Sequence, residues 1–104
     1  SLEYEVIIID VGFTLYLNTI AKPKNYYSLS YLENRNNIYV TNWNIRALNP
    51  SKFNSSIYEN RIDYSPQIRY GLEVNYKLFN YFQFAQQKYK IRLDRGSGLS
   101  PNFR

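Results

Sequence analysis

The side-chain period of residues 68–93 constrains the fold of this chain most strongly. Apolar and aromatic side chains alternate with polar ones from residue 68 to 78, and the alternation resumes between residues 88 and 93. A period of two places successive side chains on opposite faces of a β-strand, whereas on a helix the same apolar residues scatter around the cylinder. The stretch therefore predicts a β-hairpin with one charged face.

Three further segments have strand-like patterns. Residues 2–20 combine an apolar run at 6–9 with alternation from 11 to 17, and Gly12 suits a bulge between the two halves. Residues 26–32 and 38–45 flank the polar segment 33–37, whose asparagines are typical of a turn. With at most one short helical turn, the sequence predicts a mainly β fold: an antiparallel sheet, sandwich or partial barrel of about five strands.

Length and composition bound the domain organisation and the chemistry. The 104 residues predict a single β-rich domain over residues 1–95, followed by a flexible tail over 96–104 that is rich in Gly and Ser. Cysteine and histidine are absent, which removes disulfides, the usual zinc, copper and haem ligand sets, and the commonest general base. We expect a protein that is not an enzyme and has no cofactor, metal site or catalytic residue.

Charge runs from acidic to basic along the chain. Residues 1–21 carry three acidic side chains and no basic one, whereas residues 77–104 carry six basic side chains against Asp94. On a strand, alternate basic side chains would share one face with aromatic rings nearby, which is how several sheet modules hold single-stranded nucleic acid. Lysines on an exposed edge strand also prevent aggregation, so that role stays open. The candidate residues for nucleic acid or another anionic partner are Lys88, Lys90, Arg92, Arg95, Phe82 and Phe84.

Residues 64–93 resemble the strand pairs of bacterial outer-membrane β-barrels in their alternation and in their tyrosines and phenylalanines, and residues 12–19 have a similar texture. The resemblance implies a barrel built from a longer parent chain or from several chains, because about eight strands are the minimum for closure. The side chains expected to face lipid or a neighbouring subunit are Tyr70, Leu72, Val74 and Tyr76.

The segment Asp10-Val11-Gly12-Phe13-Thr14 follows an apolar run and resembles the first phosphate-handling motif of two enzyme families. In actin-like sugar kinases a strand ends in Asp-x-Gly-x-Thr, and in the haloacid dehalogenase family it ends in a nucleophilic Asp. This sequence has Gly12 where the second family has another Asp. The resemblance implies a metal-holding or nucleophilic Asp10, while an Asp beside a strand bulge is the preferred interpretation.

Together these patterns predict a structural or assembly protein whose amphipathic Tyr- and Phe-rich strands contact neighbouring subunits, copies of the same chain included. An outer-membrane barrel is one form of that prediction, and membrane contact would then run through strands. The alternative is a single-strand-binding or ribosome-associated module that uses the basic C-terminal face. A large complex or the outer membrane is favoured over the free cytoplasm, and the sequence leaves compartment, partner and oligomeric state open.

Overall fold

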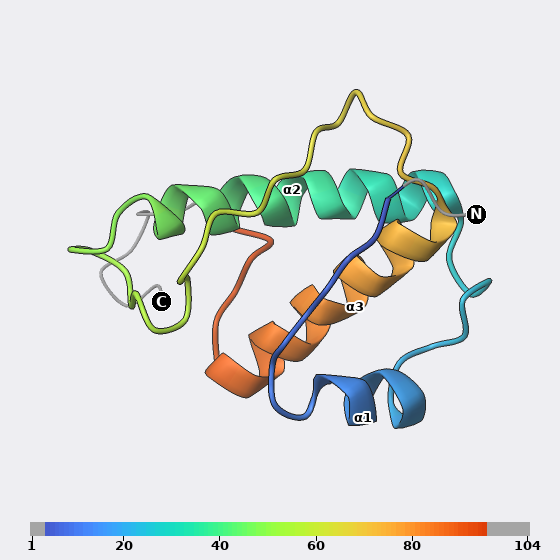
Figure 1. Ribbon diagram of the computed structural model, residues 1–104, viewed down its shortest axis with the longest axis horizontal. Coiled ribbons are helices and arrows are strands. Elements are labelled where there is room, and N and C mark those ends of the chain that lie inside the picture. The colour runs from blue at the N-terminus through green and yellow to red at the C-terminus, as the bar shows by residue number, and fades with distance from the viewer. Residues whose placement is uncertain (1–3, 96–104) are drawn as a thin grey trace.

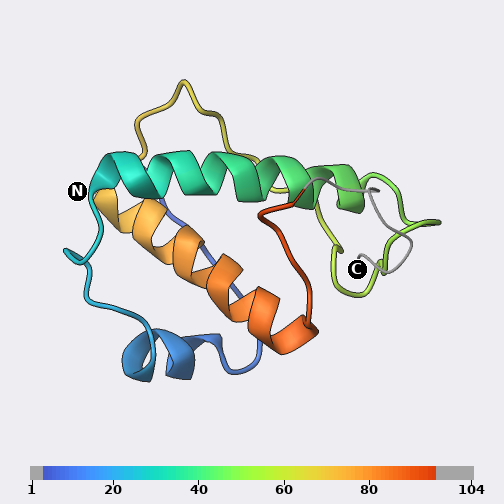
Figure 2. The ribbon, with the colours of Figure 1, turned by 180° about the vertical axis from the view of Figure 1, so that it is seen from behind.

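The computed structural model describes residues 4–95, and within that range the chain is helical rather than β-rich. It contains α1 (Phe13–Thr19), α2 (Leu29–Ala47) and α3 (Leu72–Tyr89), and no residue from 4 to 95 belongs to a β-strand. Helices α2 and α3 form the central pair, and α1 packs against the side of α3 that faces away from α2 (Figure 1, Figure 2). The prediction of an antiparallel sheet, sandwich or partial barrel of about five strands is therefore wrong.

The function predicted from those strands is wrong for the same reason. The segments that resemble outer-membrane strand pairs form α1, loop and α3 instead. Assembly through amphipathic Tyr- and Phe-rich strands is therefore contradicted as well. No helix within residues 4–95 has both the length and the apolar composition needed to cross a membrane. The predicted tail, residues 96–104, lies outside the described part of the chain.

Helix α2 replaces the hairpin expected over residues 26–45. Ser28 caps its N-terminus, because the hydroxyl oxygen accepts a hydrogen bond of 3.1 Å from the backbone N–H of Tyr31. The expected turn at 33–37 lies inside the helix. Buried side chains recur every three or four residues, at Leu32, Asn36, Tyr39, Val40, Trp43 and Arg46. Polar side chains occupy two of these positions, so the helical stripe is invisible to a search for apolar residues alone.

Helix α3 replaces the long hairpin. Val74, Leu78, Phe82 and Ala85 are buried at the spacing of one helical face. Helix α2 covers α3 on one side while α1 covers it on another, so α3 carries apolar side chains around much of its circumference. The apparent period of two combined residues of α3 with the flanking segments 68–71 and 90–93, which are not helical. Lys90, in the left-handed region with φ 57°, ends the helix.

The main core lies between α2 and α3 and is closed by loops. Phe53 and Tyr58 of the long connection, with Ile91 and Leu93 of the C-terminal segment, complete it. A second, smaller cluster joins Phe13 and Tyr16 of α1 to Phe84 of α3. The rings of that cluster meet edge to face, with centroids 5.6 Å apart for both pairs.

The guanidinium of Arg46 joins the loops to α2. The side chain is fully buried; it donates a hydrogen bond of 2.8 Å to the Tyr58 hydroxyl and one of 2.6 Å to the carbonyl of Arg92. The guanidinium also lies over the ring of Phe53, 5.7 Å from its centroid. Burial lowers the pKa of Arg46, and the hydrogen bond to Tyr58 partly offsets that effect. Arginine nevertheless remains protonated at neutral pH, because its ordinary pKa is above about 12.

Replacing Arg46 with Met should destabilise the fold. The change removes the charged donor from the Tyr58 hydroxyl and the Arg92 carbonyl, so urea denaturation should show a loss of about 2–4 kcal/mol. Arg61→Met, at an exposed loop position, is the matched control and should stay within about 0.5 kcal/mol of the wild type. Equal effects of the two changes would contradict the role given to Arg46.

Exposed Asn37 distinguishes the helix from the expected turn. In a helix, the Asn37→Ala variant should be more stable than the Asn37→Gly variant by about 1 kcal/mol, because glycine has the greater freedom to lose on folding. In an asparagine-rich turn with positive φ, the order would reverse. Thermal denaturation of the two variants, followed by circular dichroism, measures the difference.

Candidate binding cleft

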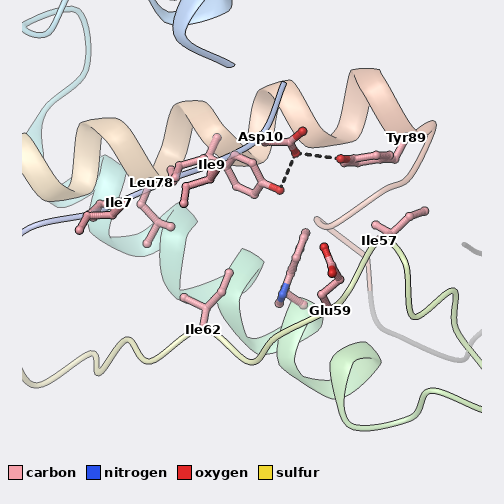
Figure 3. A pocket seen from close by; sticks show the side chains of 12 residues that line it. Ile7, Ile9, Asp10, Ile57, Glu59, Ile62, Leu78 and Tyr89 are labelled. Atoms are coloured by element: carbon pink, nitrogen blue, oxygen red, sulfur yellow. Dashed lines mark hydrogen bonds between the residues drawn. The ribbon is translucent and has the colours of Figure 1, made fainter. Parts of the chain in front are cut away.

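A cleft opens between two loop segments that are distant in the sequence. Residues 4–10 border one side, and residues 57–64 border the other (Figure 3). The cleft has two adjoining parts of about 310 and 350 Å³, and Val6, Ile62 and Leu78 line both of them. The two parts therefore form one continuous feature along α3.

The first wall is the segment of residues 4–10, which we call the N-terminal strap. It runs straight along α3 and is paired with no strand within the described range (Figure 1). Exposure alternates along it: Val6 and Ile8 are partly buried, whereas Ile7 and Ile9 are 76% and 97% exposed. All four consecutive residues 6–9 nevertheless line the cleft. Because neighbouring side chains of an extended chain point in opposite directions, a backbone edge must border the cleft.

Contacts along its length hold the N-terminal strap against α3. The ring of Tyr4 meets that of Tyr70 edge to face, with centroids 4.9 Å apart. The ammonium group of Lys77 donates a hydrogen bond of 2.8 Å to the carbonyl of Val6. The partly buried side chain of Ile8 packs beside the smaller core cluster. These contacts keep the strap in place without a neighbouring strand.

The last contact is a cluster around the Asp10 carboxylate, which we call the Asp10 clasp. Lys88 donates from Nζ at 2.6 Å. Tyr89 donates from its hydroxyl at 2.8 Å and Tyr81 from its hydroxyl at 3.1 Å, and Figure 3 draws these two bonds. Burial alone would raise the pKa of Asp10, but the hydrogen bonds from these three side chains outweigh it and hold the pKa below its ordinary value. The carboxylate therefore stays ionised at neutral pH.

The second wall, residues 59–64, is attached to α2 by polar side chains. The indole N–H of Trp43 donates to the carbonyl of Asn60 at 2.9 Å. The amide of Asn44 bonds both backbone groups of Ile62: Oδ1 accepts from its N–H at 2.7 Å, and Nδ2 donates to its carbonyl at 2.9 Å. Asn44 thus satisfies one edge of this segment much as a neighbouring strand would.

The floor of the cleft is apolar and its rim is acidic. Val74 and Leu78 of α3 and the ring of Trp43 of α2 form the floor. The exposed side chains of Glu5, Glu59 and Asp63 lie at the rim, and no lysine or arginine lines either part of the cleft. The arrangement suits a ligand with apolar groups on one side and positive charge on the other.

The basic and aromatic residues singled out in the sequence do not form a strand face. Lys88 belongs to the Asp10 clasp in the last turn of α3, and Lys90 is the exposed residue that ends this helix. Arg92 pairs with Asp94 at 3.0 Å, and Arg95 is exposed in the segment beyond. The rings of Phe82 and Phe84 are 0% and 8% exposed, which leaves no face for a base to stack on. The basic strand face with stacking rings, on which the nucleic-acid alternative depends, is therefore not formed.

The predicted lipid-facing or subunit-facing row is not formed either. Val74 is buried, and Leu72 is packed against the main core. Tyr70 stacks on Tyr64 with centroids 4.9 Å apart, while the hydroxyl of Tyr76 donates to the carbonyl of Lys22. Tyr70 precedes α3, and the helix turns Val74 away from Leu72 and Tyr76, whereas a strand would align all four. Two of them, Tyr70 and Val74, line the cleft instead.

Asp10 lies in a turn before α1, not in a phosphate loop. Gly12, with φ 91°, precedes the helix, and the carbonyl of Asp10 accepts a 3.1 Å hydrogen bond from the N–H of Phe13. Its side chain is engaged by donors from α3, as described above. Within residues 4–95, no group of three or more Asp or Glu side chains could hold a metal ion.

Sequence reasoning missed most of the residues that line the cleft. Ile62, Glu59 and Asp63 lie in the long connection between α2 and α3, where no periodic pattern marks them. Trp43 lies within residues 38–45, whose pattern predicts a strand. The apolar run 6–9 predicts a segment covered on both sides. In the structure these residues line the cleft, but Ile7 and Ile9 are exposed.

The Asp10 clasp makes a testable contribution to stability. Asp10→Ala should lower the free energy of unfolding at pH 7 by about 1–3 kcal/mol, whereas Asp63→Ala, at an exposed position, should have little effect. Because the pKa of Asp10 is lower in the folded than in the unfolded chain, acid favours unfolding.

The stabilisation by Asp10 should be complete above its ordinary pKa and should disappear as the pH falls below about 4. Urea denaturation of the wild type and Asp10→Ala at a series of pH values measures the difference. A difference that stayed constant down to pH 2 would contradict the clasp.

Comparison with known proteins places the chain in a family. A model described as "Family of unknown function (DUF6146)" matches residues 1–100. No curated protein and no solved structure matches the sequence. Because the family match spans nearly all of the 104 residues, the chain belongs to DUF6146, a family of unknown function.

Proposed function

We propose that this chain is a non-catalytic polypeptide-binding domain that takes up an extended segment of a partner protein in the cleft. The observation that carries the proposal is the position of two non-helical walls, residues 4–10 and 59–64, on either side of an apolar floor. An extended peptide bound between such walls gains affinity from backbone hydrogen bonds and specificity from alternate side chains.

The N-terminal strap supports this mode of binding. Its backbone edge borders the cleft, and the strap is paired with no strand in the described range. An extended edge of this kind is a template for pairing with another chain. Each part of the cleft, at about 310 and 350 Å³, is comparable to a small ligand pocket and has room for a few side chains.

Exposed apolar side chains beside the cleft point to the same function. Ile7, Ile9 and Val11 are 76%, 97% and 88% exposed, although each is large and apolar. Contiguous apolar side chains on a protein surface often mark a site of protein contact. A partner that paired with the strap would cover Ile7 and Ile9 with the outward side chains of its own extended segment.

The ionisable groups at the cleft favour binding over proton transfer. Burial, together with the nearby charge of Glu33, raises the pKa of Tyr64 to about 12, and burial followed by the charge of Asp10 raises the pKa of Tyr81 further. Both hydroxyls therefore stay protonated at neutral pH, and Tyr81 donates to the ionised Asp10. General acid or base groups work best with a pKa near the operating pH, which these groups lack.

A selection from a random peptide library tests the proposed function. Selected peptides should bind the wild type and should lose at least about tenfold in affinity for Ile62→Trp, because the larger ring fills the space shared by both parts of the cleft. Leu48→Trp is the matched control, since Leu48 is 68% exposed at the end of α2 and lies outside the cleft. Affinities can be measured by isothermal titration calorimetry.

Amide exchange of the complex locates the bound peptide. Residues 6–9 should become protected in the wild type and stay unprotected in Ile62→Trp. Peptides that bound the wild type and Ile62→Trp equally would show that the cleft is not the binding site, and the proposal would be wrong.

A further inference from the structure

The charge of the cleft is opposite to that of the chain as a whole. The chain has a formal net charge of +5, yet the side chains that line the cleft include Glu5, Asp10, Glu59 and Asp63 and no lysine or arginine. Asp10 is neutralised by its pair with Lys88. The three exposed acids of the rim outnumber the one other nearby cation, Lys77, whose ammonium group bonds the Val6 carbonyl, so the local charge stays negative. Arg61, the basic residue of the second wall, is not among the lining side chains.

From this charge pattern we infer that the preferred occupant is an extended segment in which apolar residues alternate with Lys or Arg. The inference rests on the proposed function and specifies its ligand. In an extended segment successive side chains point in opposite directions, so one set meets the floor of Val74, Leu78 and Trp43 while the other reaches the rim.

The positions of the acids fit that alternation. Glu5 lies on the N-terminal strap, whereas Glu59 and Asp63 belong to the opposite wall. Outward basic side chains of a bound segment would therefore have carboxylates on both sides of them. Their long methylene stems would also cover apolar surface, which suits the exposed side chains of Ile7 and Ile9.

The cleft contains its own spectroscopic reporter. Trp43 is the only tryptophan of the chain, it is 4% exposed, and it lines the cleft. Its emission should change when a peptide without aromatic residues covers the floor. The probes are three blocked peptides of equal length in which Val alternates with Lys, with Gln or with Glu.

At low salt, the Lys peptide should bind at least about fivefold more tightly than the Gln peptide, and the Glu peptide should bind most weakly. The preference should shrink as salt is added, because the rim carboxylates are exposed. In the double variant Glu59→Gln/Asp63→Asn, the Lys and Gln peptides should bind with similar affinity.

Matched single variants separate a local effect from the net charge of the chain. Asp63→Asn, at the rim, should reduce the preference for the Lys peptide, whereas Asp94→Asn removes one Asp outside the cleft and should retain the full preference. An equal loss in both single variants would overturn the inference, because general electrostatic attraction would then account for the binding.

The remaining outcomes distinguish the inference from the proposed function. If library peptides bind through the cleft but the Lys peptide shows no advantage, the charge inference is wrong and the binding function stands. If no library or designed peptide depends on an open cleft, as judged with Ile62→Trp, both are wrong.

Discussion

The buried guanidinium of Arg46 is the interaction on which the non-helical half of the structure depends. Loops and the C-terminal segment have few regular backbone hydrogen bonds, so they need side-chain donors to fix them. Arg46 supplies donors to Tyr58 and to the carbonyl of Arg92, which precede and follow α3 in the sequence. Because Tyr58 lies between Ile57 and Glu59, which both line the cleft, this cation inside the core also fixes that side of the cleft.

Hydrogen bonds from amide side chains likewise fix the position of α2 relative to α3. Asn36 donates from Nδ2 to the backbone carbonyl of Asn75 at 2.9 Å and to its side-chain oxygen at 3.1 Å, and Tyr64 donates to the same side-chain oxygen at 2.7 Å. Such directional bonds in a buried contact are satisfied in one relative position of the two helices, whereas apolar contacts tolerate sliding. A largely aromatic core is thereby held in a defined register.

The buried polar residues explain how far the fold could be predicted from the sequence. Asn36 and Arg46 lie on the inward face of α2, so its stripe of apolar letters is interrupted and the asparagines near residue 36 resemble a turn. In α3, coverage by both neighbouring helices places apolar residues on several sides, which hides the period of 3.6. Tertiary packing therefore decides both helices against their local pattern. The apolar run at residues 6–9 predicts a covered strand, whereas the structure places it in an unpaired segment that leaves Ile7 and Ile9 exposed.

The cleft could not be predicted from the sequence either. Its lining combines the start of the chain, the long connection and the middle of α3, and only the fold brings these together. Asp10 drew attention through a phosphate-binding resemblance, whereas its carboxylate serves as an acceptor for Lys88 and two tyrosines. A short motif does not reveal which distant donors will surround it.

The anchoring of the N-terminal strap has a consequence for the thermodynamics of complex formation. The strap is fixed by Tyr70 at one end, by Lys77 midway and by the Asp10 clasp at the other end. Fixing the backbone of one residue costs about 1–2 kcal/mol of conformational entropy, and here that cost is met during folding instead of during association. A ligand would then lose only its own freedom, so a preorganised receptor could discriminate between short segments that a disordered one would bind too weakly to distinguish.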